Sequence, residues 1–509
     1  MGRAARYHPR LSPAVSAPFR IVVLGGGTAG WMAANLFAAR WAGRATVTVI
    51  ESPEIGIIGV GEGSTPQLKA FFDTLGIAER EWMPRCNATY KNGISFAGWS
   101  KRPGFDRYFH PFSSPVDQHT AANFFRATRA RRAGYEAWAQ PDRYFLAARL
   151  AEERRAPVEP ENFPLGPHYG YHFDAYLVGA FLREVATARG VTHLPRKVDE
   201  VVVADGQVQA LRLEGDELVE GDLFIDASGF RALIHGQALG EPFRPFAENL
   251  FNDRAVVMPT PADRTGTNAA TRSTALSHGW CWDIPLTNRT GNGYVYSSRY
   301  CTPNEAEREL RTHLEIGDDV AARHLTMRVG RVERSWAGNC LAVGLSQGFI
   351  EPLEATALHI VQATVDGFID AFERGGFTPQ HRDAFNQAIA ARYDGIRDYI
   401  VLHYRVNGRT DTPYWRDNAA NQNLSDSLKR ILTCWFTGGD LEAEIAEQGI
   451  ETYYPALSWH CLLAGYGVYP KGEPTRGPAR ALPDMREVDR FIARCATNFS
   501  DHKQLLESL

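Results

Sequence analysis

A glycine fingerprint between two apolar runs, within residues 20–51, constrains the fold of this chain more than any other stretch. Ile21–Leu24 is a short apolar run that favours a buried parallel strand. A helical pattern follows, and Thr46–Ile50 predicts a second strand. The turn between the first strand and the helix reads G-x-G-x-x-G, with its glycines at Gly25, Gly27 and Gly30. The sequence therefore predicts a β-α-β unit of an α/β fold.

Each glycine of this turn has a physical role in binding a dinucleotide. Gly25 permits the tight turn, Gly27 lets the backbone approach a pyrophosphate, and Gly30 allows the helix to pack closely on the strand. The helix N-terminus supplies amide donors and a partial positive charge. Glu51, at the end of the second strand, is placed to accept hydrogen bonds from ribose hydroxyls. The alternative is a glycine-rich turn that binds nothing.

Composition narrows the class of protein. The chain has 509 residues, of which 44% are hydrophobic and 22% charged, and these values are typical of a globular protein. Its net charge of −4 argues against nucleic acid or an anionic membrane as the main partner. No run of about 18 apolar residues occurs, and residues 1–17 contain no apolar core of a secretory signal, so we expect a loose tail there and a cytoplasmic protein. The seven cysteines form no C-x-x-C pair, so we expect neither a disulfide framework nor a metal site.

A second segment predicts a return of the chain to the nucleotide. Residues 221–229 read as an apolar strand that ends in Asp226-x-x-Gly229. FAD-dependent hydroxylases return to their cofactor at a strand of this kind, far along the chain. Because the chain contains only one G-x-G-x-x-G, a single dinucleotide is indicated. A strand that ends in an ordinary turn is the alternative.

Residues 280–285 read Trp-Cys-Trp-Asp-Ile-Pro. In an extended strand, residues i and i+2 project to the same face, so Trp280 and Trp282 would form one wide aromatic wall. Taken alone, the stretch is equally typical of a half-buried strand that ends at a proline.

Three segments together resemble the flavin-dependent tryptophan halogenases. They are GGGTAGWMAA at 25–34, the W-x-W-x-I-P hexapeptide at 280–285, and GFIEPLEAT at 348–356. Further similar stretches extend the resemblance over most of the chain: 59–66, 79–96, 172–182, 328–336 and 403–415. The hexapeptide together with the fingerprint is specific for this family, whereas two tryptophans alone are not.

The resemblance implies FAD, used as FADH2, and a halide ion as cofactors. Reduced FAD and O₂ oxidise the halide to hypohalous acid, and Trp280 and Trp282 form a barrier that keeps the organic substrate away from the flavin. FADH2 would come from a separate NAD(P)H-dependent flavin reductase. The residues implied in FAD binding are Gly25, Gly27, Thr28, Ala29, Gly30, Glu51, Asp226, Gly229 and Gly344.

Two residues match the catalytic positions of the family. The ammonium group of Lys91 would orient hypohalous acid, or its neutral amine would form a haloamine, and both need a desolvated site. Glu354 would polarise the oxidant or accept the proton that the aromatic ring loses, as a partner of Lys91. The alternatives are a solvated lysine and acids, Glu351 and Glu354, that serve the N-terminus of the following helix.

The resemblance places the halide at the backbone amides of Thr356 and Ala357, at the start of that helix. Here the chain departs from its relatives, because it reads E-A-T-A where tryptophan-specific members usually read E-S-T-G. A hydroxyl group is lost and a glycine gains a methyl group. We therefore expect bromide, which is larger and less hydrated than chloride, to be accepted or preferred.

His110, Phe112 and Tyr454 match aromatic positions around the substrate indole. Free tryptophan is held in the relatives by a tyrosine-rich, acid-containing insertion before the last of these positions. The corresponding residues 438–449 are shorter and read as an ordinary amphipathic helix. We therefore expect indole or an indole-like aromatic substrate, and a bulkier or peptide-borne indole stays open.

The predicted fold class is α/β, with a Rossmann-like FAD-binding module of the flavin monooxygenase type, mixed sheets, and a largely helical substrate module. We expect the FAD-binding module in residues 18–355, interrupted by substrate-side segments in about 91–165, and the helical module in 356–509. Residues 55–64 match a strap between the flavin and substrate sites. We expect a monomer or homodimer. The alternative functions are a flavin-dependent aromatic hydroxylase or epoxidase, and a flavin-binding protein without catalytic activity.

Overall fold

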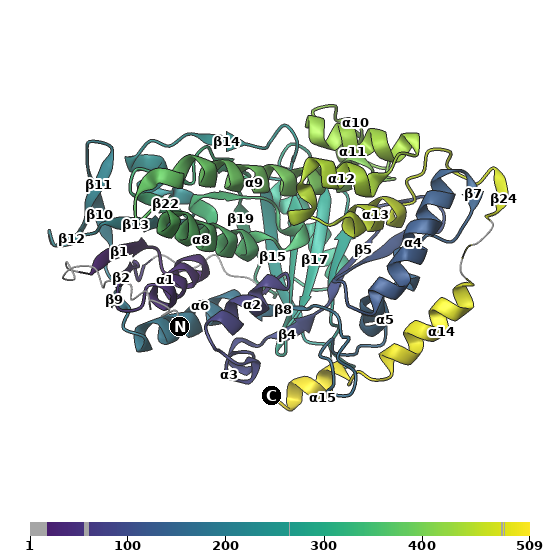
Figure 1. Cartoon of the computed structure of the whole chain (residues 1–509), viewed down its shortest axis with the longest axis horizontal. Coiled ribbons are helices and arrows are strands. Elements are labelled where there is room, and N and C mark those ends of the chain that lie inside the picture. Colours follow the sequence, from purple (N-terminus) through teal and green to yellow (C-terminus); the bar gives the residue numbers. More distant parts are fainter. Residues whose placement is uncertain (1–17, 55–60, 264, 480–481, 483) are drawn as a thin grey trace, which may run out of the picture.

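The computed structural model describes residues 18–54, 61–263, 265–479, 482 and 484–509 (Figure 1). The predicted tail at 1–17 and residues 55–60 of the predicted strap lie outside these ranges.

The glycine fingerprint follows a central strand of a sheet of six described strands. Strands β22, β13, β1, β2 and β9 are parallel, and β21 joins the edge in the antiparallel direction. The apolar residues of β1 alternate between two core clusters, so both faces of this strand are buried, as its continuous apolar run predicts. In sheet order the strands are β21 (Trp336–Ala337), β22 (Cys340–Ala342), β13 (Leu223–Asp226), β1 (Phe19–Leu24), β2 (Ala45–Ile50) and β9 (Thr192–Leu194).

Helices cover one face of this sheet and a small antiparallel sheet covers the other. Helix α1 packs between α6 and α8, while apolar residues of β11 join the core on the opposite face. These elements are α1 (Thr28–Arg40), α6 (Ala175–Ala188), α8 (Ala357–Arg374), β10 (Val198–Ala204), β11 (Gln207–Leu213) and β12 (Leu218–Glu220).

A larger sheet of seven described strands stands in the centre of Figure 1 and contains the tryptophan hexapeptide. All its pairs are antiparallel except β16 with β5. Helix α7 (Pro303–Leu314) packs against β15 and β18. In order the strands are β19 (Arg323–Thr326), β15 (Arg254–Pro261), β18 (Arg289–Tyr296), β17 (Gly279–Pro285), β16 (Thr271–Ala275), β5 (Gly93–Ala97) and β6 (Arg107–Pro111).

Small sheets connect these parts. Strands β3 (Gly61–Gly63), β8 (Gly170–Asp174) and β4 (Thr89–Lys91) form one, with β8 in the middle. Strands β14 (Phe243–Pro245), β20 (Gly330–Val332) and β23 (Gly348–Phe349) form another, and β23 leads into the loop before α8. Two short helices, α2 (Gln67–Thr74) and α3 (Glu79–Trp82), precede β4.

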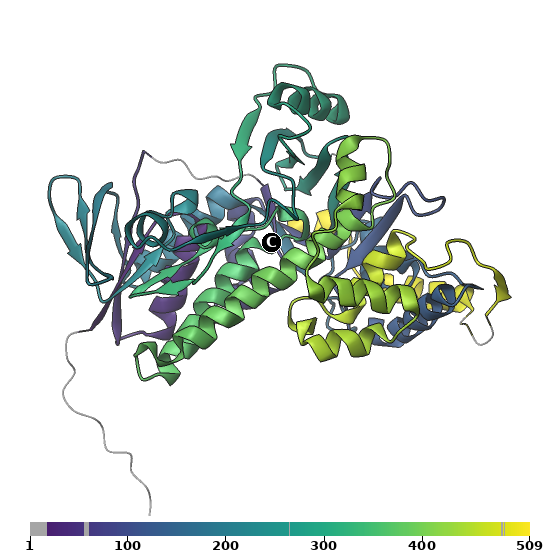
Figure 2. The same cartoon turned by 90° about the horizontal axis from the view of Figure 1, so that it is seen from above.

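The C-terminal part of the chain is mainly helical. Figures 1 and 2 show α9 as a long helix that runs from beside α8 to the group formed by α10–α13. A short strand, β24 (Arg476–Pro478), pairs with β7 (Tyr135–Glu136). The helices of this C-terminal part are α9 (Arg382–Arg405), α10 (Pro413–Ala420), α11 (Asp426–Thr437), α12 (Leu441–Gln448), α13 (Ala456–Gly465), α14 (Met485–Ala496) and α15 (His502–Glu507). Two helices from earlier in the chain, α4 (Asp117–Arg132) and α5 (Leu146–Glu152), pack with them.

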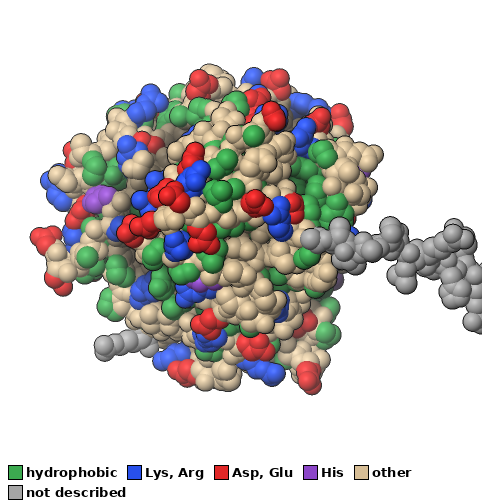
Figure 3. Space-filling model, turned by 90° about the vertical axis from the view of Figure 1, so that its left-hand side faces the viewer, with side chains coloured by type: hydrophobic (Ala, Val, Ile, Leu, Met, Phe, Trp, Pro, Cys, Tyr) green, Lys and Arg blue, Asp and Glu red, His purple; other side chains and the backbone are tan. Residues whose placement is uncertain are grey.

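The predicted α/β class with mixed sheets and a helical module is confirmed. Among the described residues, no helix is long and apolar enough to cross a membrane. Basic and acidic side chains are interspersed on the face of the molecule that Figure 3 shows.

Candidate active site

The glycine turn has the geometry that a dinucleotide requires. Gly25 has φ +120°, and a Cβ there would overlap the carbonyl oxygen of Ala227. A Cβ at Gly30 would overlap the carbonyl oxygen of Gly25, which explains the close packing of α1 on β1. By contrast, nothing lies within 4 Å of a Cβ at Gly27. Helix α1 begins there without a side-chain cap, so its first amides can receive a phosphate and the residues present fit the predicted FAD.

Glu51 lies against this turn. A Cβ built at Gly26 would overlap the Glu51 carboxylate, so only glycine fits there. The carboxylate also lies 2.7 Å from Nε2 of His193 and 3.5 Å from a guanidinium nitrogen of Arg183. The predicted ribose acceptor therefore stands beside the fingerprint, close to two basic groups.

Both oxygens of the Asp226 carboxylate accept hydrogen bonds from other groups of the protein. One oxygen accepts hydrogen bonds from the hydroxyls of Ser228 and Ser346, and the other accepts from the amides of Ile234 and His235. We infer that Asp226 acts on the candidate cofactor site by fixing loops rather than by a direct side-chain contact.

Two glycines lie on the loops that Asp226 fixes. The Ser346 hydroxyl, which donates to Asp226, also lies 3.0 Å from the carbonyl oxygen of Gly229, so the two loops lie side by side. Gly344 has φ +62°, and a Cβ there would come within 2.7 Å of Cβ of Ala29. The loop at Gly344 therefore packs directly on the start of α1, beside Thr28 and Ala29.

The tryptophan wall is present. Trp280 and Trp282 lie on the same face of β17, with ring centroids 6.0 Å apart and an interplanar angle of 57°. Both indoles are buried. Trp282 lies flat over Gly293 of the neighbouring strand, where any side chain would overlap the indole. The expected strand that ends at Pro285 is confirmed.

Lys91 ends β4 and is completely buried. Its Nζ has no hydrogen-bond partner among the described residues and lies 5.6 Å from the ring centroid of Phe112. It also lies against the strand that continues the strap, because a Cβ at Gly63 would be only 3.1 Å from Nζ. Burial lowers the pKa of Lys91 to about 7, against the opposing charge of Glu354. The alternative of a solvated lysine is wrong.

Glu354 is also buried, and its carboxylate is held by two imidazoles. Nδ1 of His110 lies 3.2 Å from Oε2, and Nε2 of His403 lies 3.1 Å from Oε1. Burial alone would raise the pKa of Glu354, but the two histidines outweigh it and hold the pKa at about 2. Glu354 forms no ion pair with Lys91 in the described chain, although its charge acts on the lysine. It therefore stays ionised at neutral pH.

The outer nitrogens of both imidazoles also have partners. Nε2 of His110 lies 2.9 Å from the hydroxyl of Ser458, and Nδ1 of His403 lies 2.9 Å from the hydroxyl of Tyr466. These hydroxyl contacts orient both rings so that one nitrogen of each faces the Glu354 carboxylate.

Tyr399 joins the predicted substrate residues, and the sequence interpretation missed it together with His403. The ring of Tyr399 stacks on Tyr454 at 3.7 Å and lies 6.0 Å from His110. Tyr399 and His403 are four residues apart, on one face of α9. That spacing is the one signal in the sequence that could have paired them. Phe112 is separate from this stack and contacts Lys91 instead.

The N-terminus of helix α8 receives no side-chain cap from the loop before it. Thr356 precedes α8, which begins at Ala357, and neither Glu351 nor Glu354 bonds to its first amides. The alternative in which these acids cap the helix is therefore wrong. Ala355 adopts φ +56°, a left-handed conformation, and this turns the chain into the helix.

The segment that corresponds to the tryptophan clamp forms helix α12, as predicted. Its acidic residues are used in ion pairs with neighbouring helices. Glu442 pairs with Arg129, while Glu444 and Glu447 both pair with Arg430. These carboxylates are therefore engaged away from the aromatic stack.

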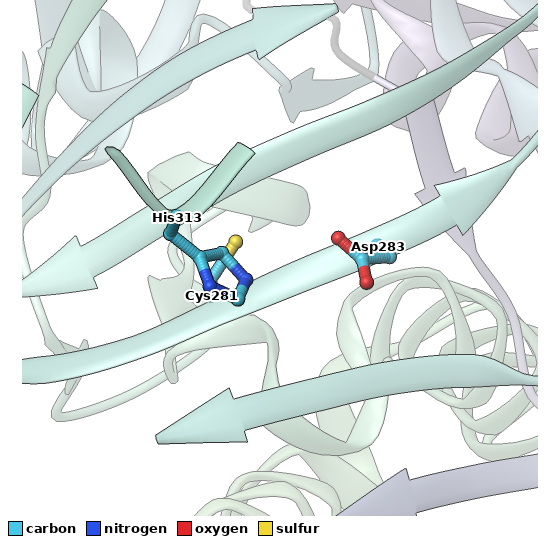
Figure 4. Close-up of side chains that lie close together, drawn as sticks. All are labelled: Cys281, Asp283 and His313. Carbon is cyan, nitrogen blue, oxygen red and sulfur yellow. The ribbon is translucent and has the colours of Figure 1, made fainter. Parts of the chain in front are cut away.

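One trio of described residues offers atoms of the kind that bind metals. Cys281, Asp283 and His313 lie behind the tryptophan wall, with one potential ligand atom from each within 4.8 Å of the others (Figure 4). Arg272 already binds Asp283, at 2.6 Å, and burial raises the pKa of the Cys281 thiol. We therefore assign no metal to this trio.

The family model for tryptophan halogenases matches residues 20–480. Tryptophan 6-halogenase SttH of Streptomyces toxytricini is 37% identical over 93% of this chain and 93% of its own length, and its crystal structure superposes with a TM-score of 0.82. MibH, a lanthipeptide tryptophan 5-halogenase, superposes with a TM-score of 0.84 at 29% identity and covers 98% of this chain and 94% of its own. BrvH, a flavin-dependent halogenase from Brevundimonas sp. BAL3, does so with a TM-score of 0.81 at 32% identity over 96% and 98% of the two chains. The chain, with its buried lysine, tryptophan wall and glycine fingerprint, therefore belongs to the tryptophan halogenase family and is a flavin-dependent halogenase.

Proposed function

We propose that this enzyme halogenates indole or an indole-like aromatic compound through an oxidant delivered to Lys91, and that it prefers bromide to chloride. The observation that carries the delivery step is the Lys91 amine, which is fully buried and has no partner among the described residues. An unpaired buried amine is costly for stability, and such groups are typical of functional sites.

Reduced FAD, when bound, supplies the oxidation of a halide ion to hypohalous acid with O₂. The protein's own residues then control where that oxidant goes. Trp280 and Trp282 occupy the face of β17 that would otherwise admit an aromatic ring to the flavin. A small oxidant can travel round this wall, and Lys91 is the buried hydrogen-bonding group that would receive it.

Lys91 can act as an ammonium or as an amine, because its pKa of about 7 populates both forms near neutral pH. The ammonium would donate a hydrogen bond to hypohalous acid and hold it toward the substrate. The amine would form an N–halogen bond and release water. The ionised Glu354, held by His110 and His403, is placed to accept the proton that the aromatic ring loses.

Indole is favoured over free tryptophan because, among the described residues that match the clamp, the acids of α12 are already paired. The acids of α12 are committed to Arg129 and Arg430, so they would have to break ion pairs to bind an ammonium group. Close to Glu354 lies a cluster of flat rings, His110, Tyr399 and Tyr454, which would suit an electron-rich aromatic.

Bromide preference rests on the halide loop. Ala355 and Ala357 present methyl groups where relatives usually have a hydroxyl group and a glycine. Chloride is more strongly hydrated than bromide, so it loses more hydration when it binds. A less polar loop compensates for less of that loss, which favours bromide. The amides at Thr356 and Ala357 are common to both ions, so they do not discriminate.

The test is an assay with purified protein, FAD, a separate flavin reductase with NADH, indole, and equal concentrations of bromide and chloride. We expect brominated indole as the main product, and little product when free tryptophan replaces indole. A gain of oxygen instead of halogen would favour the monooxygenase alternative. NADH consumption by the pure protein without a reductase would contradict the separate partner.

A further inference from the structure

Glu351 is a buried carboxyl group that the proposed chemistry does not use. It lies in the loop between β23 and α8 and is 1% exposed. Its Oε2 accepts a hydrogen bond from Nδ2 of Asn252 at 2.7 Å and a longer one from the indole nitrogen of Trp280 at 3.4 Å. Its Oε1 has no hydrogen-bond partner among the described residues.

The groups around Glu351 are uncharged. Nδ2 of Asn252 also contacts the hydroxyl of Tyr404 at 2.9 Å, and the hydroxyl of Tyr414 donates to Oδ1 of Asn252 at 2.9 Å. No ion pair of the described chain includes Glu351, whereas Glu354, three residues later, has two imidazoles. The two neighbouring acids therefore stand in opposite environments.

This environment favours the neutral acid. A buried carboxylate without a cation loses its hydration with no opposite charge to compensate for it, whereas a neutral carboxyl group that lacks one acceptor loses a single hydrogen bond. Burial accordingly raises the pKa of Glu351 to about 7, and the hydrogen bonds from Asn252 and Trp280 oppose that rise.

Glu351 also connects three parts of the site. Trp280 belongs to the wall on β17, and Tyr404 and Tyr414 belong to α9 and α10. The chain that continues from Glu351 reaches the candidate halide residues, Thr356 and Ala357, within six residues. The side chain therefore fastens one indole of the wall to the halide loop.

We propose that Glu351 is a positioning residue that ties Trp280 to the halide loop and that it carries a proton whenever a halide ion occupies that loop. The inference rests on the proposed function, because it takes residues 355–357 as the halide loop. A bound anion and an ionised Glu351 would repel each other in a site of low polarity, so the halide and the proton bind together.

Other titratable groups near the site define the controls. Tyr404 and Tyr414 face Glu351 from α9 and α10, and burial raises the pKa of both hydroxyls well above 10, so they stay neutral. Lys91 is different, because its pKa of about 7 would give halide affinity the same direction of pH dependence. The experiment must therefore separate Lys91 from Glu351.

Calorimetric titration of bromide into the oxidised, FAD-loaded protein between pH 6 and pH 9 tests the proton coupling. We expect the dissociation constant of the wild type to rise above pH 7, by up to about tenfold per pH unit. In Lys91→Met, where Glu351 is the remaining group of the two, the rise should persist, and in the double variant Lys91→Met/Glu351→Gln it should disappear. A flat profile in the wild type or in Lys91→Met, a rise that survives in the double variant, or no bromide binding at all would each overturn the proposal.

The indole signals of ¹⁵N-labelled protein test the positioning role without turnover. Trp280→Phe identifies the Trp280 resonance. Glu351→Gln retains an acceptor oxygen and should keep the hydrogen-bonded shift and slow exchange of this N–H group, while Glu351→Leu should lose both. An unchanged Trp280 signal in Glu351→Leu would show that the bond does not hold the indole.

These outcomes are separable from those of the proposed function. If the wild type binds bromide with the expected pH dependence but forms no halogenated product, the proposed function fails and the coupling stands. If brominated indole forms but bromide binding does not depend on pH, the proposed function stands and the proton coupling at Glu351 fails.

Discussion

Lys91 is a buried amine that lowers stability, and we propose that it serves the halogenation reaction. Its amine is charged at every pH below about 7 in the folded protein and below its ordinary value of 10.5 in the unfolded chain. Between these values only the unfolded chain binds the proton, so the wild type gains stability as the pH rises through this window. We predict that Lys91→Met abolishes halogenation, keeps FAD binding, and raises the free energy of unfolding near pH 7 by up to about 4 kcal/mol.

Urea unfolding at pH 7 and pH 10 measures this effect. The gain of Lys91→Met over the wild type should shrink toward pH 10, where the native lysine is neutral. Lys69→Met is the matched control, since Lys69 is partly exposed on α2 and pairs with Asp73 four residues later. It should leave both activity and stability almost unchanged. An active Lys91→Met enzyme would remove the lysine from the mechanism.

The pair formed by β17 and β18 builds the wall as a unit. Trp282 pairs with Gly293 in the ladder, and its ring occupies the space that a side chain at Gly293 would need. We predict that Gly293→Ala pushes the indole out of place, costs about 1–3 kcal/mol of stability, and raises the share of oxidant that escapes as peroxide. The yield of halogenated product per NADH, with peroxide measured in parallel, reports the leak.

Gly477→Ala, in β24, is the control substitution for Gly293→Ala, because nothing lies within 4 Å of a Cβ at Gly477. It should change neither stability nor yield. If Gly293→Ala left the product yield unaltered while destabilising the protein, the wall would be a packing feature without a role in containing the oxidant.

Across the whole molecule, the C-terminal helix α15 supports the strand that ends in Lys91. His502 on α15 is fully buried, accepts a hydrogen bond from the amide of Tyr90 at 3.1 Å, and lies 3.1 Å from the carbonyl oxygen of Thr267. We predict that His502→Ala, which leaves both backbone groups unpaired, costs about 2–3 kcal/mol and lowers halogenation more than FAD binding.

The pH dependence of this contact has a definite sign. Burial lowers the pKa of His502 to about 4, so between pH 6.5 and pH 4 only the unfolded chain binds the proton, and the wild type loses stability as the pH falls. His502→Ala should lack this part of the loss in thermal or urea unfolding. Lys503→Ala, at an exposed neighbour, should resemble the wild type. Equal acid sensitivity of His502→Ala and the wild type would contradict the assignment.

Apolar runs, alternation and helical periodicity in the sequence predicted the strands and helices that such patterns mark. The strands on either side of the fingerprint begin one or two residues earlier than expected, because edges depend on pairing partners as well as on apolar runs. The hexapeptide strand and the helix predicted within residues 438–449 followed from alternation and periodicity, whereas the helix start at Thr356 and Ala357 came from the family resemblance. The resemblance to a known family pointed to Lys91 and Glu354, which no periodicity marks.

The sequence by itself determined the nucleotide-binding unit and the shared face of Trp280 and Trp282, because both depend on neighbours a few residues apart. Only the tertiary structure decided the charges at the site. Glu351 and Glu354 are adjacent in one loop, yet uncharged groups surround the first and two histidines from distant segments hold the second. A carboxyl group's pKa depends on burial and on the charges around it. Those contacts join residues that lie 49 to 244 positions apart in the chain, so no local pattern records them.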